Sequence, residues 1–342
     1  MKKVSLPLAF VGLSSLAAFA PPAIAQTETL AGKPISLIVG FSPGGGYDLY
    51  ARLAADHYGR HLPGAPKILV QNMPGGGGRR SIVHLAGNAA RDGTVIGMLP
   101  QAVALDTLLG EMPANVNVAT LEPIGRMTDN IELQVTWHTS PTKTFADAQK
   151  RETTTAATGA AGISSFVPRV TNLLLGTKFK VIDGYRGSAD MVLAVERGEA
   201  EGMVQTWPDL KSNNRRLLDQ KQLNLVWQIS INRHPELPNV PALVEFAQTP
   251  LQKGALQAIA GTAEVGRSLA APGGVSEERM KILRSSFEKM VKDQAFLDDA
   301  AKRNLPISPA SSDQLKTWIA QTMATPKEAI EPLKTALAES SK

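Results

Sequence analysis

Two stretches of the chain share one design: an apolar run, a glycine cluster and then a pattern with helical spacing. The first is ISLIVGFSPGGGYDLYAR (Ile35–Arg52), and the second is ILVQNMPGGGGRRSIVHLA (Ile68–Ala86). A third apolar run, Val95–Leu99, follows the second helical pattern. Strand, glycine turn and helix repeated in this order predict a parallel sheet covered by helices, with the turns at the carboxyl ends of the strands.

A second unit of the same kind follows. The runs IELQVTW, TTTAAT and GMVQTW predict strands, and TFADAQKRE and SADMVLAVERGE predict helices with Thr144 and Ser188 as N-caps. Between them, Gly159–Phe166 makes a third glycine-containing entry into a helix. From Val275 onward the pattern is mainly helical, with Ser276 as N-cap, and we expect this tail to return and cover the first unit. The pattern predicts two similarly built α/β lobes.

The first 25 residues have the composition of an export signal. The positive start MKK precedes the apolar run Val4–Ala20, and the triplet Ala23–Ala25 supplies the small residues at which signal peptidase cleaves. A membrane anchor is the alternative, but the run is short and contains proline and glycine. We therefore expect cleavage after Ala25 and a periplasmic mature protein of 317 residues (342 minus 25), enough for two ordinary domains.

Composition limits the possible functions. Hydrophobic residues make up 43% of the chain and charged residues 20%, as in a soluble globular protein with a core. The chain has no cysteine, which excludes disulfides, thiolate metal sites and cysteine nucleophiles. The net charge of +5 comes without a long basic run, so nucleic-acid binding is not expected. We expect no cofactor and no metal ion.

The segment Gly40-Phe41-Ser42-Pro43-Gly44 matches G-x-S-x-G, the nucleophile elbow of serine hydrolases. That fold builds half of its oxyanion hole from the backbone N–H of the residue after the serine. Here that residue is Pro43, which has no N–H. Loss of one such donor costs about a hundredfold or more in rate. A secreted hydrolase using Ser42 is therefore the weaker alternative, and we expect no enzyme activity.

The glycine clusters Gly44–Gly46 and Gly75–Gly78 lack the Gly-Lys-Ser/Thr of a P-loop and the spacing of a dinucleotide site. What they share is glycine directly before a helix. Glycine allows a ligand to approach the backbone, and the helix start points unpaired N–H groups and the positive dipole end at the same space. Two such turns predict a shared site for an anion such as a carboxylate. The alternative is that they only permit tight packing of strand against helix.

Residues next to these turns have two interpretations each. Asp48 either compensates the helix dipole or accepts hydrogen bonds from loop amides and holds the loop in shape. Arg79 and Arg80 oppose the dipole of their helix, so they either point to solvent or lie beside a bound anion. Tyr47 and Trp207 either stack on an aromatic ligand or pack in the core or at its rim.

Five blocks stand in order along the chain: GKPISLIVGFSPGGGYDLYAR, VQNMPGGGG, NAARDGTVIGM, GYRGSADMVLAVERGE and RHPELPNVPALVEF. Together they resemble the receptors of the tripartite tricarboxylate transporters, also called the Bug family, over most of the mature chain. The resemblance implies a two-lobe fold like that of type II periplasmic binding proteins. In that fold two α/β lobes, joined by two crossing segments, close like a Venus flytrap on a ligand in the central cleft.

The resemblance also implies lobe boundaries and a function. The first lobe would comprise residues 26–126 and 269–342, and the second lobe residues 127–268 with the crossing segments. Such an extracytoplasmic receptor, expected to be a monomer, would capture a small carboxylate and deliver it to the large and small membrane subunits of the transporter. A sensor subunit that feeds a membrane kinase is an alternative that the sequence does not separate from transport.

By matching position, the resemblance assigns ligand contacts to glycine turns in both lobes. The implied contacts are Ser42, Gly44, Gly45 and Asp48 in the first turn, Pro74, Gly75 and Gly76 in the second, and Gly162, Ser164, Ser165, Tyr185 and Arg186 in the second lobe. The chain departs from the family pattern in its second turn, where Gly77-Gly78-Arg79-Arg80 replaces small or apolar residues. Its second-lobe turn also lacks the usual histidine. The sequence therefore does not predict which carboxylate is bound.

Overall fold

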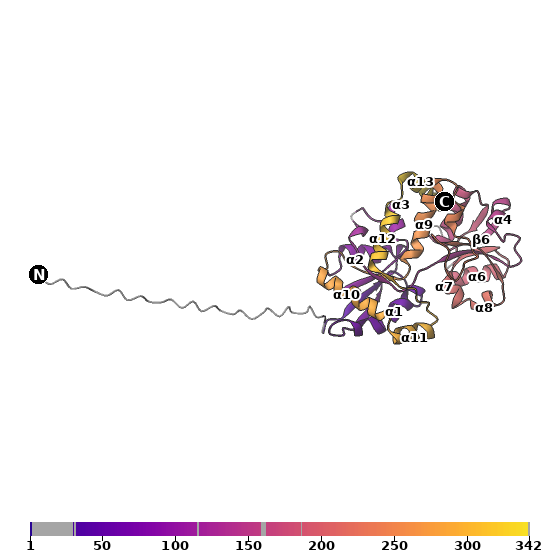
Figure 1. The fold of residues 1–342 in the computed structure, drawn as a ribbon. Helices are drawn as coiled ribbons and strands as arrows, with labels where there is room; N and C mark the ends of the chain where they lie inside the picture. Colours follow the sequence, from indigo (N-terminus) through magenta and orange to yellow (C-terminus); the bar gives the residue numbers. More distant parts are fainter. Residues whose placement is uncertain (2–29, 31, 115, 159–161, 186, 341–342) are drawn as a thin grey trace.

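Two α/β lobes lie side by side in the computed structural model, which describes residues 1, 30, 32–114, 116–158, 162–185 and 187–340 (Figure 1). The predicted signal peptide and its cleavage site after Ala25 lie outside these residues. None of the helices in the described part of the chain has the length and apolar character that a bilayer span requires. Each lobe is a sheet with packed helices, which confirms the predicted α/β architecture. The prediction of parallel sheets holds only in part, because each sheet also contains antiparallel pairs.

The first lobe is built on a sheet whose strands come from distant parts of the chain. In spatial order they are β11 (Ala310–Ser311), β4 (Glu122–Arg126), β10 (Ser268–Ala271), β3 (Val95–Leu99), β1 (Ile35–Val39) and β2 (Ile68–Asn72). The accompanying helices are α1 (Gly46–Tyr58), α2 (Arg79–Gly87), α3 (Val103–Leu109), α10 (Glu277–Met290), α11 (Gln294–Lys302) and α12 (Ser312–Met323).

Strand β1 fixes the position of both glycine turns. It pairs in parallel with β2 on one side and with β3 on the other. Val39 at the end of β1 lies opposite Asn72 at the end of β2, so both turns leave the same edge of the sheet. The alternate side chains of Ile35, Leu37 and Val39 are buried in one apolar cluster with α1, α10 and α11. The predicted placement of the two turns at neighbouring strand ends is confirmed.

The second lobe repeats the α/β design on its own sheet. Its strands, in spatial order, are β7 (Phe179–Ile182), β6 (Thr153–Ala156), β8 (Gly202–Thr206), β5 (Glu132–Trp137) and β9 (Leu223–Ile229). Its helices are α4 (Phe145–Lys150), α5 (Ile163–Leu175), α6 (Ser188–Glu196), α7 (Trp207–Lys211), α8 (Arg215–Asp219) and α9 (Pro250–Val265). Thr144 and Ser276 cap α4 and α10 as predicted, whereas the cap of α6 is Gly187, and Ser188 is its first helical residue.

The two segments that cross between the lobes are bonded to each other. The chain passes from β4 to β5 through Met127–Ile131, and it returns from α9 to β10 through Gly266 and Arg267. The Met127 amide donates to the Arg267 carbonyl at 3.0 Å, and the Arg267 amide donates to the Thr128 carbonyl at 2.8 Å. Gly266 has a φ of +48°, and a Cβ there would lie 2.2 Å from the Thr128 oxygen. Close approach of the two segments therefore requires glycine at this position.

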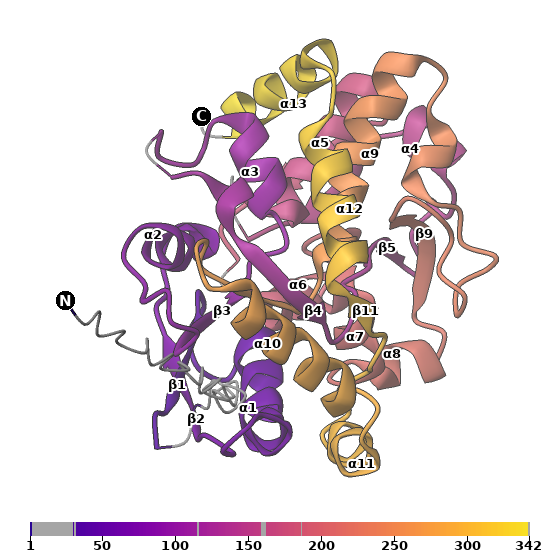
Figure 2. The ribbon, with the colours of Figure 1, turned by 60° about the vertical axis from the view of Figure 1, so that its left-hand side comes forward.

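The last helix, α13 (Lys327–Ser340), does not lie with the rest of the helical tail (Figure 2). Helices α10 and α11 pack on the first lobe, as expected, whereas α12 packs both on β4 of the first lobe and on α9. The side chains of Ala329, Leu333 and Ala336 are instead buried in the second-lobe cluster that contains α5 and α9. The lobe boundaries at residues 126 and 269 stay a prediction. They assign α13 to the first lobe, whereas α13 packs on helices of the second lobe.

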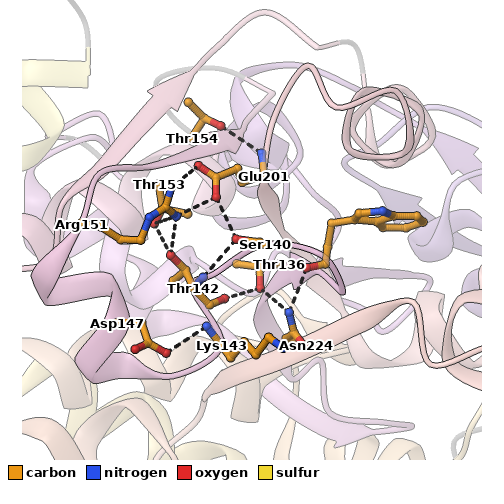
Figure 3. A network of polar contacts seen from close by, with 11 residues as sticks. Thr136, Ser140, Thr142, Lys143, Asp147, Arg151, Thr153, Thr154, Glu201 and Asn224 are labelled. Carbon is orange, nitrogen blue, oxygen red and sulfur yellow. Dashed lines mark hydrogen bonds and ion pairs between the residues drawn. The ribbon is translucent and has the colours of Figure 1, made fainter.

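A polar network closes the second lobe at the end of its sheet where β8 begins (Figure 3). Arg151 donates from Nη1 to Oε2 of Glu201 at 2.7 Å and from Nη2 to Oε1 at 3.0 Å. Ser140 donates to the same Oε2 at 2.8 Å, and Arg151 also donates to the buried Thr142 hydroxyl. Because β8 ends at Thr206, which lines the cavity between the lobes, this network lies at the opposite end of the strand. We therefore expect it to stabilise the second lobe and not to contact a ligand.

Replacing Glu201 should test the energetic weight of this network. Burial raises the pKa of Glu201, but hydrogen bonds from Arg151 and Ser140 outweigh it and hold the pKa below its usual value. Glu201→Gln should lower the free energy of unfolding at pH 7 by about 1–2 kcal/mol, because a charged acceptor is lost. The loss should shrink as the pH falls through the lowered pKa, because the wild-type carboxyl is then also neutral.

Urea denaturation at a series of pH values measures this difference. Glu199→Gln is the matched control, since that carboxylate is exposed and lies 3.9 Å from Arg197. Equal effects of the two substitutions would contradict a special role for the network.

Candidate functional site

The first glycine turn is held in shape by Asp48. Gly44 has a φ of +83°, and its amide donates to Oδ2 of Asp48 at 2.9 Å. Arg52 donates to both carboxylate oxygens, at 2.8 and 3.0 Å. Burial raises the pKa of Asp48, but the hydrogen bonds from Arg52, Gly44 and Asn72 together hold it below its usual value. Of the two interpretations of Asp48, the geometry supports the one in which it accepts from a loop amide and fixes the loop.

Asp48 also links the first turn to the second. Asn72, the last residue of β2, donates from Nδ2 to Oδ1 of Asp48 and to the Phe41 carbonyl, both at 2.9 Å. A Cβ on Gly40 would lie 2.8 Å from the Cα of Gly78, so the backbones of the two turns are in contact. The two predicted turns therefore form one surface at the edge of the first sheet.

The second turn is a run of glycines in a conformation that other residues rarely adopt. The φ angles of Gly75, Gly76, Gly77 and Gly78 are +142°, +56°, +64° and +94°. A Cβ on Gly78 would also lie 2.5 Å from the Pro100 ring. Both the positive φ and this clash therefore exclude a side chain at Gly78.

The two arginines after the second turn differ in their surroundings. Arg79 pairs with Asp106 at 3.1 Å and with Glu111 at 3.0 Å, both on or just after α3. Its guanidinium is therefore engaged within the first lobe. Arg80 is exposed on the surface of α2.

The predicted serines of the second lobe bond within their own lobe. Gly162 is the N-cap of α5. The hydroxyl of Ser164 accepts from the Thr158 amide at 3.1 Å, and the fully buried Ser165 accepts from Arg169. Tyr185 is partly buried beside an apolar cluster of the second lobe. Arg186 and residues 159–161 lie outside the described residues.

A cavity of about 340 Å³ lies between the lobes, beside the first glycine turn. It brings together residues from both lobes and from the second crossing segment: Gly44, Gly45 and Gly46; Ser188, Gln205, Thr206 and Asp209; Arg267; and Asn304, Leu305 and Pro306. Of the predicted contacts, Gly44 and Gly45 belong to this lining. The lining does not include the other predicted contacts that the structure describes: Ser42, Asp48, Pro74, Gly75, Gly76, Gly162, Ser164, Ser165 and Tyr185.

Arg267 is one of several lining residues that the sequence analysis did not predict as contacts. Its side chain is 9% exposed, and the guanidinium carbon lies 4.0 Å from the centroid of the Tyr47 ring. Its Nη2 donates to Oδ1 of Asn130 at 3.1 Å. Tyr47 packs in the core of the first lobe, as one of its two interpretations held, and its ring also supports the buried guanidinium of Arg267. The available signal was an arginine in Gly266-Arg267-Ser268, between an apolar helix and an apolar strand.

A polar chain runs from the first lobe to the second beside Arg267. The Gln101 amide donates to the Tyr47 hydroxyl at 2.8 Å, and the Gln101 side chain accepts from Asn130 and donates to Oε1 of Glu132 at 2.9 Å. Burial raises the pKa of Glu132 to about 7, against the opposing effects of Gln101 and the Arg267 charge. Its Oε2 is shut off from solvent and has no hydrogen-bond partner among the described residues. Those residues also contain no cluster of histidine, aspartate and glutamate arranged to hold a metal ion.

Comparison with known proteins gives a consistent result. Residues 50–334 match the model of the family described as "Tripartite tricarboxylate transporter family receptor" (TctC). A protein from Cupriavidus necator, described as a UPF0065 protein in the gbd 5′ region, is 25% identical over 340 residues, which are 95% of each chain.

Solved structures show the same fold. A TctC solute-binding protein from Polaromonas, without ligand, aligns with a TM-score of 0.68 at 20% identity and covers 89% of this chain and 99% of its own. Rpa4515 of R. palustris, solved with adipate, aligns with a TM-score of 0.63 at 17% identity and covers 88% and 97%. The resemblance inferred from the five sequence blocks is confirmed, and so is the two-lobe binding-protein fold.

The raised pKa of Glu132 predicts a pH dependence of stability. A folded-state pKa of about 7, above the unfolded value near 4.5, means that the folded protein binds more protons between these pH values. The free energy of unfolding should therefore fall as the pH rises from about 4.5 to 7, by about 1–3 kcal/mol from this group. Glu132→Gln cannot ionise and should lack this decline.

Urea denaturation of both proteins at pH 5, 6, 7 and 8 measures the effect. The free energy of unfolding of the variant should rise relative to that of the wild type as the pH increases. A difference between the two proteins that stays constant over this range would contradict the assignment of a raised pKa to Glu132.

Proposed function

Because the chain belongs to the family of tripartite tricarboxylate transporter receptors, we propose that it captures a small carboxylate outside the cytoplasm and delivers it to a membrane transporter. The family is one of solute-binding receptors and not a class of enzymes. The cavity between the lobes carries this proposal, because it joins the amide-lined start of α1 to residues of the second lobe. A ligand held there contacts both lobes at once and favours the closed arrangement.

The chemistry of the cavity supports a carboxylate. Helix α1 begins at Gly46, directly after the turn, so its first amides have no partner within the helix and its positive dipole end faces the ligand space. The volume of about 340 Å³ suits a small organic acid better than a peptide or a nucleotide. The structure of Rpa4515 with adipate shows that a protein of the same fold binds a dicarboxylate.

The remaining parts of the proposal follow from the sequence and the family. The N-terminal residues have the pattern of an export signal, with cleavage after Ala25, and place the mature receptor in the periplasm. We propose further, from the family resemblance, that its partners are the large and small membrane subunits of the transporter and that the receptor acts as a monomer.

Ligand binding can be blocked at Gly45 without straining the backbone. Its φ is −81°, and an added Cβ would lie at an ordinary 3.7 Å from the Ser42 carbonyl. Gly44 and Gly75 are less suitable, because any side chain there is strained by the positive φ. In the wild type, a bound carboxylate at a hundred times its Kd should stabilise the fold by about 2.7 kcal/mol, a shift of several degrees in Tm. Gly45→Leu fills the cavity, and this shift should disappear.

Thermal denaturation with malonate, succinate, glutarate, adipate and citrate measures the shift. Gly87→Leu is the control, since Gly87 is the exposed last residue of α2 and an added Cβ would meet nothing within 4 Å. The proposal fails if none of these acids stabilises the wild type. Full stabilisation of Gly45→Leu would instead show that the acid binds elsewhere.

A further inference from the structure

Arg267 is a buried cation with unused hydrogen-bond donors. Its side chain is 9% exposed, and neither Nε nor Nη1 has a hydrogen-bond partner among the described residues. A guanidinium carries five N–H donors, and Asn130 accepts from one nitrogen only, Nη2. Glu132 is close enough to interact with this charge, but Nε and Nη1 still lack acceptors. Because buried donors without acceptors are costly, open donors on an arginine that lines a cavity indicate that an anion completes the site.

The guanidinium is also held in a fixed orientation. The ring of Tyr47 lies against it, and Phe41 stacks on the other side of that ring, with centroids 4.1 Å apart and planes 14° from parallel. The backbone of Arg267 is tied on both sides to the first crossing segment, through Met127 and Thr128. An arginine positioned in this way loses little conformational freedom when it binds a carboxylate, which favours affinity.

A second unused donor belongs to a residue that lines the same cavity from the second lobe. Gln205, on β8, is 3% exposed, and its carbonyl oxygen accepts from the Thr206 amide. Its Nε2 has no partner in the described part of the chain. The acidic residue in the lining, Asp209, is occupied, because its two oxygens accept from Asn213 and Asn214 at 2.7 and 2.8 Å. The unpaired groups on Arg267 and Gln205 are therefore donors, whereas the carboxylate of Asp209 is already paired.

We propose that Arg267 binds a carboxylate group of the ligand directly, and that Gln205 donates to the same ligand from the second lobe. This inference rests on the proposed function and deepens it, since it assigns a charged contact where the glycine turns supply main-chain contacts only. Because Arg267 lies on a crossing segment, its bond to the ligand ties the hinge to both lobes. The site selects a full negative charge at this end of the ligand over an uncharged isostere such as an amide.

Isothermal titration calorimetry on the mature protein tests the proposal, with malonate, succinate, glutarate, adipate and citrate as probes. Arg267→Met should weaken each acid that the wild type binds by about 10-fold to 150-fold, the range for a lost charge-assisted hydrogen bond. Arg267→Lys keeps the positive charge and should lose less affinity than Arg267→Met. Arg284→Met is the control, because this arginine pairs with Glu122 on the outside of the first lobe, and it should stay within about twofold of the wild type.

A nuclear magnetic resonance readout covers the case in which Arg267→Met does not fold. The Nε–H signal of Arg267, identified by its absence in Arg267→Lys, should shift when the acid is added to the wild type. Wild-type binding with unchanged affinity in Arg267→Met, or with an unmoved Nε–H signal, overturns this inference and leaves the proposed function intact. If the wild type binds none of the five acids, the proposed function fails and this inference with it.

Discussion

The hydrogen bonds between the two crossing segments are the constraint on which the cavity depends. Met127, Thr128 and Arg267 pair at the point where the chain leaves one sheet and returns to the other. Gly266 permits this pairing, because a Cβ there would overlap the Thr128 carbonyl. The pairing sets the distance between the sheets, and it carries the Arg267 side chain to the edge where the first glycine turn ends. Fold and site therefore share one short stretch of backbone.

Strand bounds and helix caps could be predicted from the sequence, because each depends on residues that are close together in the chain. The bounds of β1 and β3 follow from five-residue apolar runs, and the caps of α4 and α10 from single hydroxyls. The position of α13 could not be predicted in the same way. Its amphipathic pattern indicates that one face of the helix is buried, but not whether the first or the second lobe covers that face. That choice is made by long-range packing against α5 and α9.

The candidate site divides along the same line. The glycine turns were recognisable because positive φ angles demand glycine, and Gly75 to Gly78 fulfil that demand at each position. The role of a buried arginine is not visible from periodicity, because Arg267 stands between apolar segments and its neighbours in space, Tyr47 and Asn130, lie far away in the sequence. The second-lobe hydroxyls show the converse: Ser164 and Ser165 match a family motif, yet both bond within their own lobe.

The charges near the cavity depend on the hydrogen bonding and burial of two carboxyl groups, Asp48 and Glu132. The carboxylate of Asp48 accepts hydrogen bonds from Arg52, Gly44 and Asn72, so its charge is already neutralised by groups that hold the loop. Glu132 is buried enough that its pKa rises to about 7, which removes part of its charge at neutral pH. Arg267 supplies a guanidinium to the lining of the same cavity. Asn130, the hydrogen-bond partner that the described residues give Arg267, is neutral, and this is the arrangement that the proposed carboxylate would complete.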